Sequence, residues 1–379
     1  MESRLERRAT RSRHRFKAVS IFAFAVATIA AAPVGSSFAA SVSSFKVIKL
    51  LGSKGAGAKK KDAEMSNAWG IAFIAGDPFW IDDEGSGVSE LVDGKGKIFK
   101  SLPFVTIPSA TTGMGKPTGI VANTTGQFAI PGGSSAFFIF ATDDGTIAGW
   151  NSGASATTIV NNSGTESYTG LALASNGSDN MLYAANHNTP GSIDTFDSDF
   201  APVTTTGGFS DPSLPAGLTP YNITALGNDL FVAYSDGREA VGQVDEFDSE
   251  GNLIMTFTDA SLNEPWGLAL APSKFGSFSN DLLVGNLGDG TISVFNPTNG
   301  EFLGQLVANN SKPIVIQGLW GLIDGTGAMN ATADAVYFTA GPSGYAGGLF
   351  GEIEAGPAPK KKTSDPMPGP YTLMPPGMM

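Results

Sequence analysis

Hydrophobic residues in this chain fall in short alternating runs that are separated by turn-forming residues. Six times after residue 60, an alternating apolar triplet follows a dipeptide that usually ends in Gly, as in "AWGIAF" at Gly70 and "PWGLAL" at Gly267. A second apolar run follows each triplet, and in most copies a third follows a Gly-rich turn. Such alternation predicts half-buried β-strands. Because no useful amphipathic segment of helical period interrupts it, the sequence predicts an all-β protein.

The spacing of these copies predicts a propeller. Successive copies are 45 to 54 residues apart. A four-stranded meander of about 40–50 residues cannot bury both of its faces alone, so such units stack around an axis as blades. The Asp-Gly and Asn-Gly steps between the runs supply the positive φ that hairpin turns require. We therefore predict a six-bladed β-propeller of four-stranded antiparallel blades, which begin near residues 67, 116, 167, 219, 264 and 318.

One further strand-like run precedes the first repeat. It is "SFKVIKLLG", Ser44 to Gly52, while the last repeat shows only three clear strands. An open ring would leave an unpaired strand edge. We therefore predict that the N-terminal strand completes the last blade. The segment between them, "GSKGAGAKKKDAEM", is expected to be a polar, basic loop.

The two ends of the chain predict export and a tail. Residues 1–39 combine a basic start, an apolar run from Ala18 to Ala32 and a small-residue cleavage pattern, Ser37-Phe38-Ala39, which together are typical of a signal peptide. The apolar run is shorter than the about 20 residues of a membrane span, so a retained anchor is the weaker alternative. We predict a propeller over 40–356, a Pro/Met-rich extended or disordered tail over 357–379, and a secreted or periplasmic monomer without an integral membrane span.

Charge and composition exclude several functions. The chain has 23 basic and 35 acidic residues, a net charge of −12, and removal of residues 1–39 would leave 16 and 33, a net charge of −17. Such a surface repels phosphate backbones, so we expect no nucleic-acid partner. Cysteine is absent, and His187 is the one histidine beyond the signal. Thiolate metal sites are thereby excluded, and a Ser-His-Asp triad is left with one candidate base.

The residue before each repeat's Gly (or Asn222) is expected to lie near the propeller axis. Four consecutive blades would place an aromatic ring there, with Thr118 and Thr169 opposite. The four aromatic residues are Trp69, Tyr221, Trp266 and Trp320. They could form a stacking platform for a sugar, a quinone or another flat ligand. The alternative, which the sequence favours, is that they pack against one another and fill the channel.

Polar residues at the end of each second strand form another candidate ring. The proposed metal-binding set is Asp83, Asn186, Asp236 and Asn286. Oxygen ligands of this kind suit one Ca²⁺ ion. The same residue types equally cap turns by hydrogen bonding to the backbone. Asp82, Asp83 and Glu84 also lie together in "WIDDEGSG". Carboxylates crowded in this way either raise a pKa or hold a cation; because Gly-rich turn residues follow, we favour a solvated turn.

The segment "EPWGLALAP…DLLVGNLGDGTISVFNPTNGEFLGQL" resembles NHL-type propeller repeats. Over residues 44–356 the chain resembles a family of secreted bacterial propellers of unknown function, which implies architecture rather than activity. It is more distantly similar to the gluconolactonase and regucalcin-like hydrolases, in which Glu64, Asn222 and Asp236 would be the metal ligands, although the sequence around Glu64 departs from their pattern. Two functions stay open: a non-enzymatic module that binds a protein or carbohydrate partner, and a calcium-dependent, lactonase-like hydrolase at the channel mouth.

Overall fold

A computed structural model of the chain describes residues 43–237 and 241–356. All of its blades belong to one compact unit. The expected signal peptide, 1–39, and the expected tail, 357–379, lie outside the described residues. Within the described ranges, no helix is long and apolar enough to cross a membrane.

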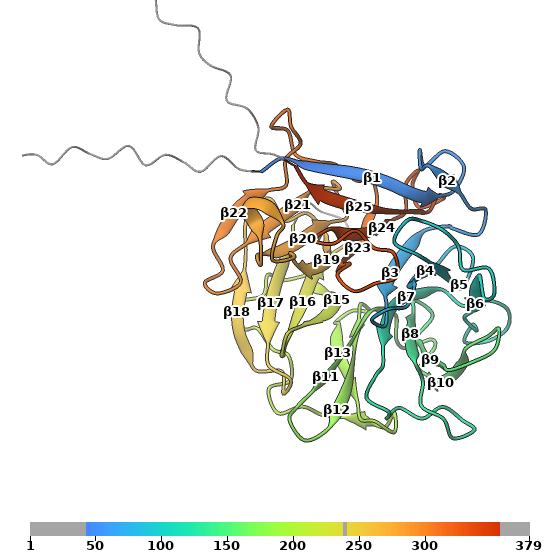
Figure 1. Cartoon of the computed structure of the whole chain (residues 1–379). Helices are drawn as coiled ribbons and strands as arrows, with labels where there is room; N and C mark the ends of the chain where they lie inside the picture. Colours follow the sequence, from blue (N-terminus) through green and yellow to red (C-terminus); the bar gives the residue numbers. More distant parts are fainter. Residues whose placement is uncertain (1–42, 238–240, 357–379) are drawn as a thin grey trace, which may run out of the picture. The chain divides into compact units, whose positions relative to one another are not determined.

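Six sheets form the propeller, and each contains four antiparallel strands (Figure 1). In chain order, blade 1 contains β3 (Ala68–Ala72), β4 (Phe79–Asp83), β5 (Val88–Val92) and β6 (Phe104–Thr106); blade 2 contains β7 (Pro117–Ala122), β8 (Phe138–Thr142), β9 (Thr146–Trp150) and β10 (Thr157–Asn161). Blade 3 contains β11 (Tyr168–Ser175), β12 (Asn180–Asn186), β13 (Ser192–Phe196) and β14 (Pro202–Val203); blade 4 contains β15 (Thr219–Leu226), β16 (Asp229–Ser235), β17 (Gln243–Phe247) and β18 (Leu253–Phe257). Blade 5 contains β19 (Pro265–Leu270), the 3₁₀ turn η1 (Gly276–Phe278), β20 (Leu282–Asn286), β21 (Ile292–Phe295) and β22 (Phe302–Gln305). The first strand of every blade is innermost, and these strands contact one another around the ring, from β3 through β7, β11, β15 and β19 to β23 (Leu319–Asp324) and back to β3.

Blade 6 is built from both ends of the described chain. Its strands are β23, β24 (Val336–Ala340), β25 (Leu349–Ala355) and then β1 (Phe45–Gly52), which pairs antiparallel with β25. Blue β1 lies beside red β25 in Figure 1. The predicted fold class and the closing strand are both confirmed. The basic loop after β1 also adds a two-residue strand, β2 (Lys60–Lys61), parallel to β1.

The hydrophobic core is divided among the blade interfaces. Each of six clusters joins two neighbouring blades, as where Ile139 of blade 2 packs with Leu171 and Leu182 of blade 3. The cluster between blades 5 and 6 includes Phe45 of β1. Its ring lies 5.0 Å from Phe275 and 5.9 Å from Phe278, centroid to centroid. Alternating strands therefore bury both faces, one in each neighbouring interface.

The recurring Gly of the repeat has a steric cause. A Cβ atom added at Gly119 would lie 2.7 Å from the Leu171 backbone nitrogen of the next inner strand. At Gly321 it would lie 2.8 Å from the Trp69 carbonyl oxygen, across the point where the ring closes. The inner strands thus approach one another too closely for a side chain. Asn222 occupies the corresponding place in blade 4, where its Nδ2 donates to the Trp266 carbonyl at 2.7 Å.

Candidate functional site

A β-bulge in each inner strand aims one side chain toward the axis. In blades 2 to 5, the register between the first two strands shifts at the residue that precedes the repeat's Gly or Asn222, and in blades 1 and 6 it shifts across that residue and the Gly. A bulge leaves its extra residue unpaired and redirects that side chain. The six residues at the bulges are Trp69, Thr118, Thr169, Tyr221, Trp266 and Trp320. The sequence identified these residues, but the bulge that positions them is visible only in the structure.

The aromatic residues of this set pack into one cluster, here called the plug. Trp69 stacks on Trp320 with ring centroids 3.7 Å apart, and Trp266 lies edge-on to both, at 6.0 and 5.7 Å. Tyr221 lies edge-on to Trp320 at 6.0 Å. The half-exposed ring of Tyr345 covers Trp320 at 5.7 Å. The four predicted arc residues are therefore brought together, as expected of neighbours on consecutive blades.

The plug is closed rather than open to solvent. Trp69, Trp266 and Trp320 are at most 8% exposed. The indole of Trp320 donates to Asn67 Oδ1 at 2.9 Å, and that of Trp266 donates to the Thr169 carbonyl at 3.0 Å. The three indole rings thus pack mainly against one another, which leaves little of their faces for a ligand. Ligand binding by the arc stays a prediction, and of these residues Trp266 is the one that also lines the cavity described next.

A cavity of about 470 Å³ runs along the axis on one side of the plug. Its wall contains segments of all six inner strands, and most of the wall is aliphatic. The half-exposed side chains of this wall include Ile71, Val121, Leu173, Leu226, Leu270 and Ile323. The polar groups among the lining residues come from Asn222, Thr224 and Asp324. The channel is therefore an apolar cavity with few polar groups, which is the usual composition of a small-molecule site.

Sequence reasoning missed this wall as a site. In the sequence, each of its residues belongs to the ordinary alternating pattern of a β-strand. The structure shows that the position three residues after each repeat's Gly or Asn222 is half-exposed in all six blades. That fixed offset within the repeat is the signal that could have indicated the wall.

The four residues of the predicted metal-binding ring do not all occupy the same position within their blades. The residues that pair with the position just before each bulge are Asp83, Thr142, Asn186, Tyr234, Asn286 and Ala340. In blade 4 this place belongs to Tyr234, so Asp236 lies two residues beyond it. Among the described residues, no group of three or more His, Asp or Glu side chains is arranged to hold a metal ion.

Three of these residues hold the loop that leads into their own blade. Oδ1 of Asp83 accepts from the Ser66 backbone N–H at 3.2 Å, Oδ1 of Asn186 from Ser167 at 3.3 Å, and Oδ1 of Asn286 from Asn263 at 3.0 Å. Asn186 also donates to Glu166. The recurring bond explains why polar residues follow the second strands: they satisfy a backbone donor at the mouth of the propeller.

The Asn286→Ala substitution should test whether this residue is structural. Its amide also donates to the Ser261 carbonyl at 3.0 Å and to Thr291 and Ser293 at 3.0 and 3.1 Å. We expect a loss of about 2–3 kcal/mol in the free energy of unfolding, measured with denaturant, because buried partners lose their hydrogen bonds. Asn299→Ala, in an exposed turn of the same blade, should cost far less. Asn286 would instead be a metal ligand if Ca²⁺ raised and EDTA lowered the melting temperature of the wild type, and if Asn286→Ala abolished both effects.

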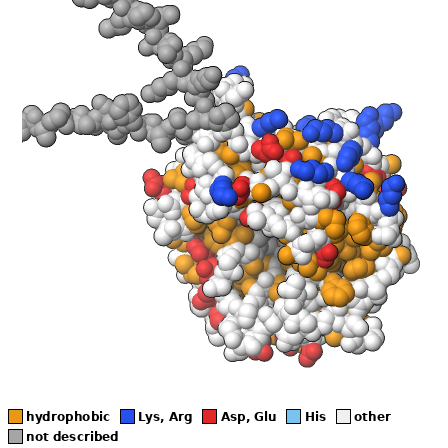
Figure 2. Space-filling model, in the orientation of Figure 1, with side chains coloured by type: hydrophobic (Ala, Val, Ile, Leu, Met, Phe, Trp, Pro, Cys, Tyr) orange, Lys and Arg blue, Asp and Glu red, His pale blue; other side chains and the backbone are white. Residues whose placement is uncertain are grey.

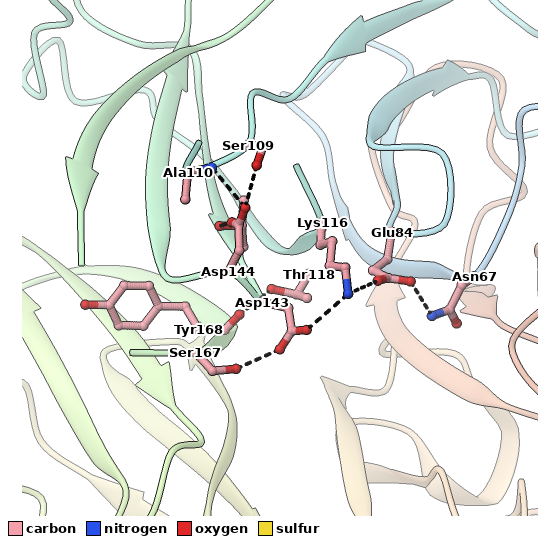
Figure 3. Close-up of polar contacts among 11 residues, drawn as sticks. Asn67, Glu84, Ser109, Ala110, Lys116, Thr118, Asp143, Asp144, Ser167 and Tyr168 are labelled. Carbon is pink, nitrogen blue, oxygen red and sulfur yellow. Dashed lines mark hydrogen bonds and ion pairs between the residues drawn. The ribbon is translucent and has the colours of Figure 1, made fainter. Parts of the chain in front are cut away.

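A polar network crosses blades 1 to 3 at this mouth (Figure 3). The Lys116 ammonium lies 3.7 Å from Glu84 and 3.9 Å from Asp143, and Ser167 Oγ donates to Asp143 at 2.7 Å. His187 lies in the same region, half-buried, with Nδ1 2.9 Å from Thr219 Oγ1. Burial lowers the pKa of His187. The lowered pKa favours the neutral form of this imidazole.

The acidic segment of blade 1 is not the solvated turn that the sequence suggested. Asp82 and Asp83 end strand β4 with 0% exposure, and Glu90 of β5 is 2% exposed. Burial, together with Asp62 and Glu64 nearby, raises the pKa of Glu90 to about 8. Burial also raises the pKa values of Asp82 and Asp83. At neutral pH the Glu90 carboxyl group therefore favours the protonated form, because burial removes the water that solvates the charged form.

These features define the protein as a six-bladed β-propeller with an aromatic plug and an apolar channel. Two relatives from Acanthamoeba polyphaga mimivirus, the uncharacterized proteins R648 and L690, are each 29% identical to it. The alignments cover 82% of this chain in both cases, with 80% of R648 and 86% of L690. No protein-family profile matches. These viral relatives add no known activity and do not support the bacterial family that the resemblance suggested.

Solved structures match most of this chain at low sequence identity and with TM-scores below 0.5. A streptogramin B lyase structure is 13% identical with a TM-score of 0.45, covering 82% of this chain and 97% of the other. A catalytically inactive variant of virginiamycin B lyase from Staphylococcus aureus, solved with quinupristin, is 12% identical with a TM-score of 0.43, covering 84% and 89%.

Proposed function

We propose that the protein is an exported, non-enzymatic binding protein whose site is the apolar channel. The observation that carries this proposal is the cavity of about 470 Å³, to which all six inner strands contribute aliphatic wall. Buried apolar surface contributes about 25 cal/mol per Å², so a cavity of this kind gains most from an apolar or partly apolar small molecule. The plug closes one end, so a ligand enters from the other.

The arrangement favours binding over catalysis. The polar groups that line the channel are an amide, a hydroxyl and one carboxylate, from Asn222, Thr224 and Asp324. None of the three is a strong base beside a nucleophile, which acyl-transfer chemistry requires. The calcium-dependent hydrolase has no comparable support: Glu64, its expected ligand, is exposed in the loop after β2. Fold alone does not decide, because propellers host both kinds of function.

A neutral apolar fluorophore, N-phenyl-1-naphthylamine, should bind the channel. We expect saturable binding at one site, with quenching of tryptophan fluorescence because Trp266 lines the cavity. Leu270→Asp, in the half-exposed wall, should weaken the binding about tenfold or more, because it places a charge against the apolar ligand.

The control for this experiment is Ile254→Asp on the outer strand β18, where the side chain is 50% exposed. This variant should bind the fluorophore like the wild type. Unsaturable binding, or an equal loss in both variants with both still folded, would remove the channel as the site. Turnover of a lactone that requires Ca²⁺ would favour the hydrolase instead.

A further inference from the structure

Nine lysine side chains gather on one rim of the propeller and are here called the lysine patch. They are Lys46, Lys49, Lys54, Lys59, Lys60, Lys61, Lys95, Lys97 and Lys100. All nine are exposed, and the described residues contain only three other lysines. In Figure 2, the blue Lys and Arg side chains concentrate over the region of β1 and β2. Among the residues that the structure describes, the positive charge is therefore strongly localised.

Two segments far apart in sequence join to form the patch. Strand β2 pairs with the end of β1 through Leu51 and Lys60. Lys60 Nζ donates to the Lys95 carbonyl of the β5–β6 segment at 2.7 Å. Gly96 lies so close to β1 that an added Cβ would be 2.9 Å from Leu50 Cβ. The patch thus extends as one surface from blade 6 onto blade 1.

The charges of the patch are not neutralised by ion pairs. The ion pairs in the described part of the chain involve Lys116 and Lys274, which lie outside the patch. Asp93, the carboxylate nearest in sequence to Lys95 and Lys97, accepts from their backbone N–H groups at 2.9 Å. From residue 117 to residue 273, by contrast, the described residues contain no lysine or arginine.

Protection of a strand edge does not account for the patch. Lysines on an outer strand can prevent edge-to-edge aggregation. However, the outer strands of the other five blades, β6, β10, β14, β18 and β22, contain no charged residue at all. These outer strands face the same risk of edge-to-edge aggregation without any lysine, so protection of an outer strand does not explain the lysines of β1 and β2.

We infer that the lysine patch binds a carboxylated or sulfated polysaccharide chain. Nine ammonium groups offer point charges that suit anionic groups spaced along a polymer. Salt screens electrostatic interactions beyond about 8–10 Å, so a thin polysaccharide chain on the patch interacts with the lysines and little with the acidic remainder of the surface. A second copy of this protein is a less suitable partner, because each copy has a net charge of −12 and the two copies repel each other. Duplex DNA carries one charge per about 1.7 Å and would be repelled by the acidic remainder of the surface. An anionic glycan therefore fits the charge distribution best.

The test measures binding of the full chain to polygalacturonate and to dextran sulfate, with neutral dextran as the uncharged comparison. We expect affinity for one or both anionic polymers that falls steeply between about 50 and 200 mM salt, because counterions are released. Replacing Lys59, Lys60 and Lys61 together by Ser should weaken binding about tenfold or more at low salt and flatten the salt dependence. The Lys95→Ser, Lys97→Ser and Lys100→Ser triple variant should have a similar effect.

A matched control carries Lys116→Ser, Lys274→Ser and Lys312→Ser, which gives the same net charge but leaves the patch intact. It should bind within about threefold of the wild type. Equal losses in the patch and control variants would show a general charge effect and overturn the proposal. So would equal binding of neutral dextran, tighter binding of single-stranded DNA, no binding to either anionic polymer, or salt-sensitive self-association that the patch variants abolish.

Discussion

Raising the pH from 5 to 9 should destabilise the protein, and Glu90→Gln should remove much of that loss. The buried Glu90 has a pKa raised from 4.5 to about 8, by burial first and then by Asp62 and Glu64. Between these two values the folded protein holds a proton that the unfolded chain has released. The free energy of unfolding therefore falls as pH rises across this window, and it is not affected by this group below about pH 4.5.

The effect should be large, because each tenfold difference in proton affinity between the folded and unfolded states corresponds to about 1.4 kcal/mol. Glu90 alone could contribute on the order of a few kcal/mol, and Asp82 and Asp83 act in the same direction. Denaturant unfolding at several pH values would measure it. Glu301→Gln, at an exposed position of blade 5, is the control and should keep the wild-type slope. A Glu90→Gln profile with the same slope as the wild type would show that this carboxyl group is not the source.

Removal of the closing strand should have the second large effect. A chain that begins at Ser53 lacks β1 and leaves the edge of β25 unpaired. It also loses Phe45, Leu50 and Leu51, which are at most 4% exposed. Burial of three such side chains contributes about 5–9 kcal/mol, which is comparable with the whole stability of a domain at about 5–15 kcal/mol. We expect the shortened chain to lose its cooperative thermal transition and to aggregate.

A chain that begins at Ser43 keeps β1 and is the matched control. It should show the cooperative transition, measured by calorimetry or near-UV circular dichroism. A synthetic peptide of residues 43–53 added to the shorter chain should restore part of the transition, because it can add a strand to the open edge of β25. If the chain that begins at Ser53 melted like the control, closure by β1 would contribute little to stability.

The fold was predictable because its causes are local and repeated. Alternation fixes which strand faces are buried, and the Gly before each apolar triplet reports a backbone approach that recurs at Gly119 and Gly321. The closing strand was predictable because "SFKVIKLLG" is too apolar for a free leader and the last repeat lacks a fourth strand. The aromatic residues Trp69, Trp266 and Trp320 could be grouped for the same reason, since a fixed offset within a repeat becomes a fixed height along the axis.

The candidate sites depended on contacts that no repeat encodes. Asp82 and Asp83 belong to a pattern that resembles a turn, yet both end strand β4 and are completely buried. Asp236 was predicted to belong to the metal-binding ring, but the strand pairing of blade 4 gives that place to Tyr234, two residues earlier. The lysines near residue 60 and those near residue 97 become one surface only because β2 pairs with β1 beside the β5–β6 segment.

The sequence by itself determined the blade count, the closing strand and the residues nearest the axis, because each follows from short-range alternation and from a pattern that recurs every 45 to 54 residues. Only the tertiary structure decided how open the channel is, which carboxyl groups lose water and which charges come together. Those properties depend on the distances between blades, and side chains that are remote in sequence set these distances by packing.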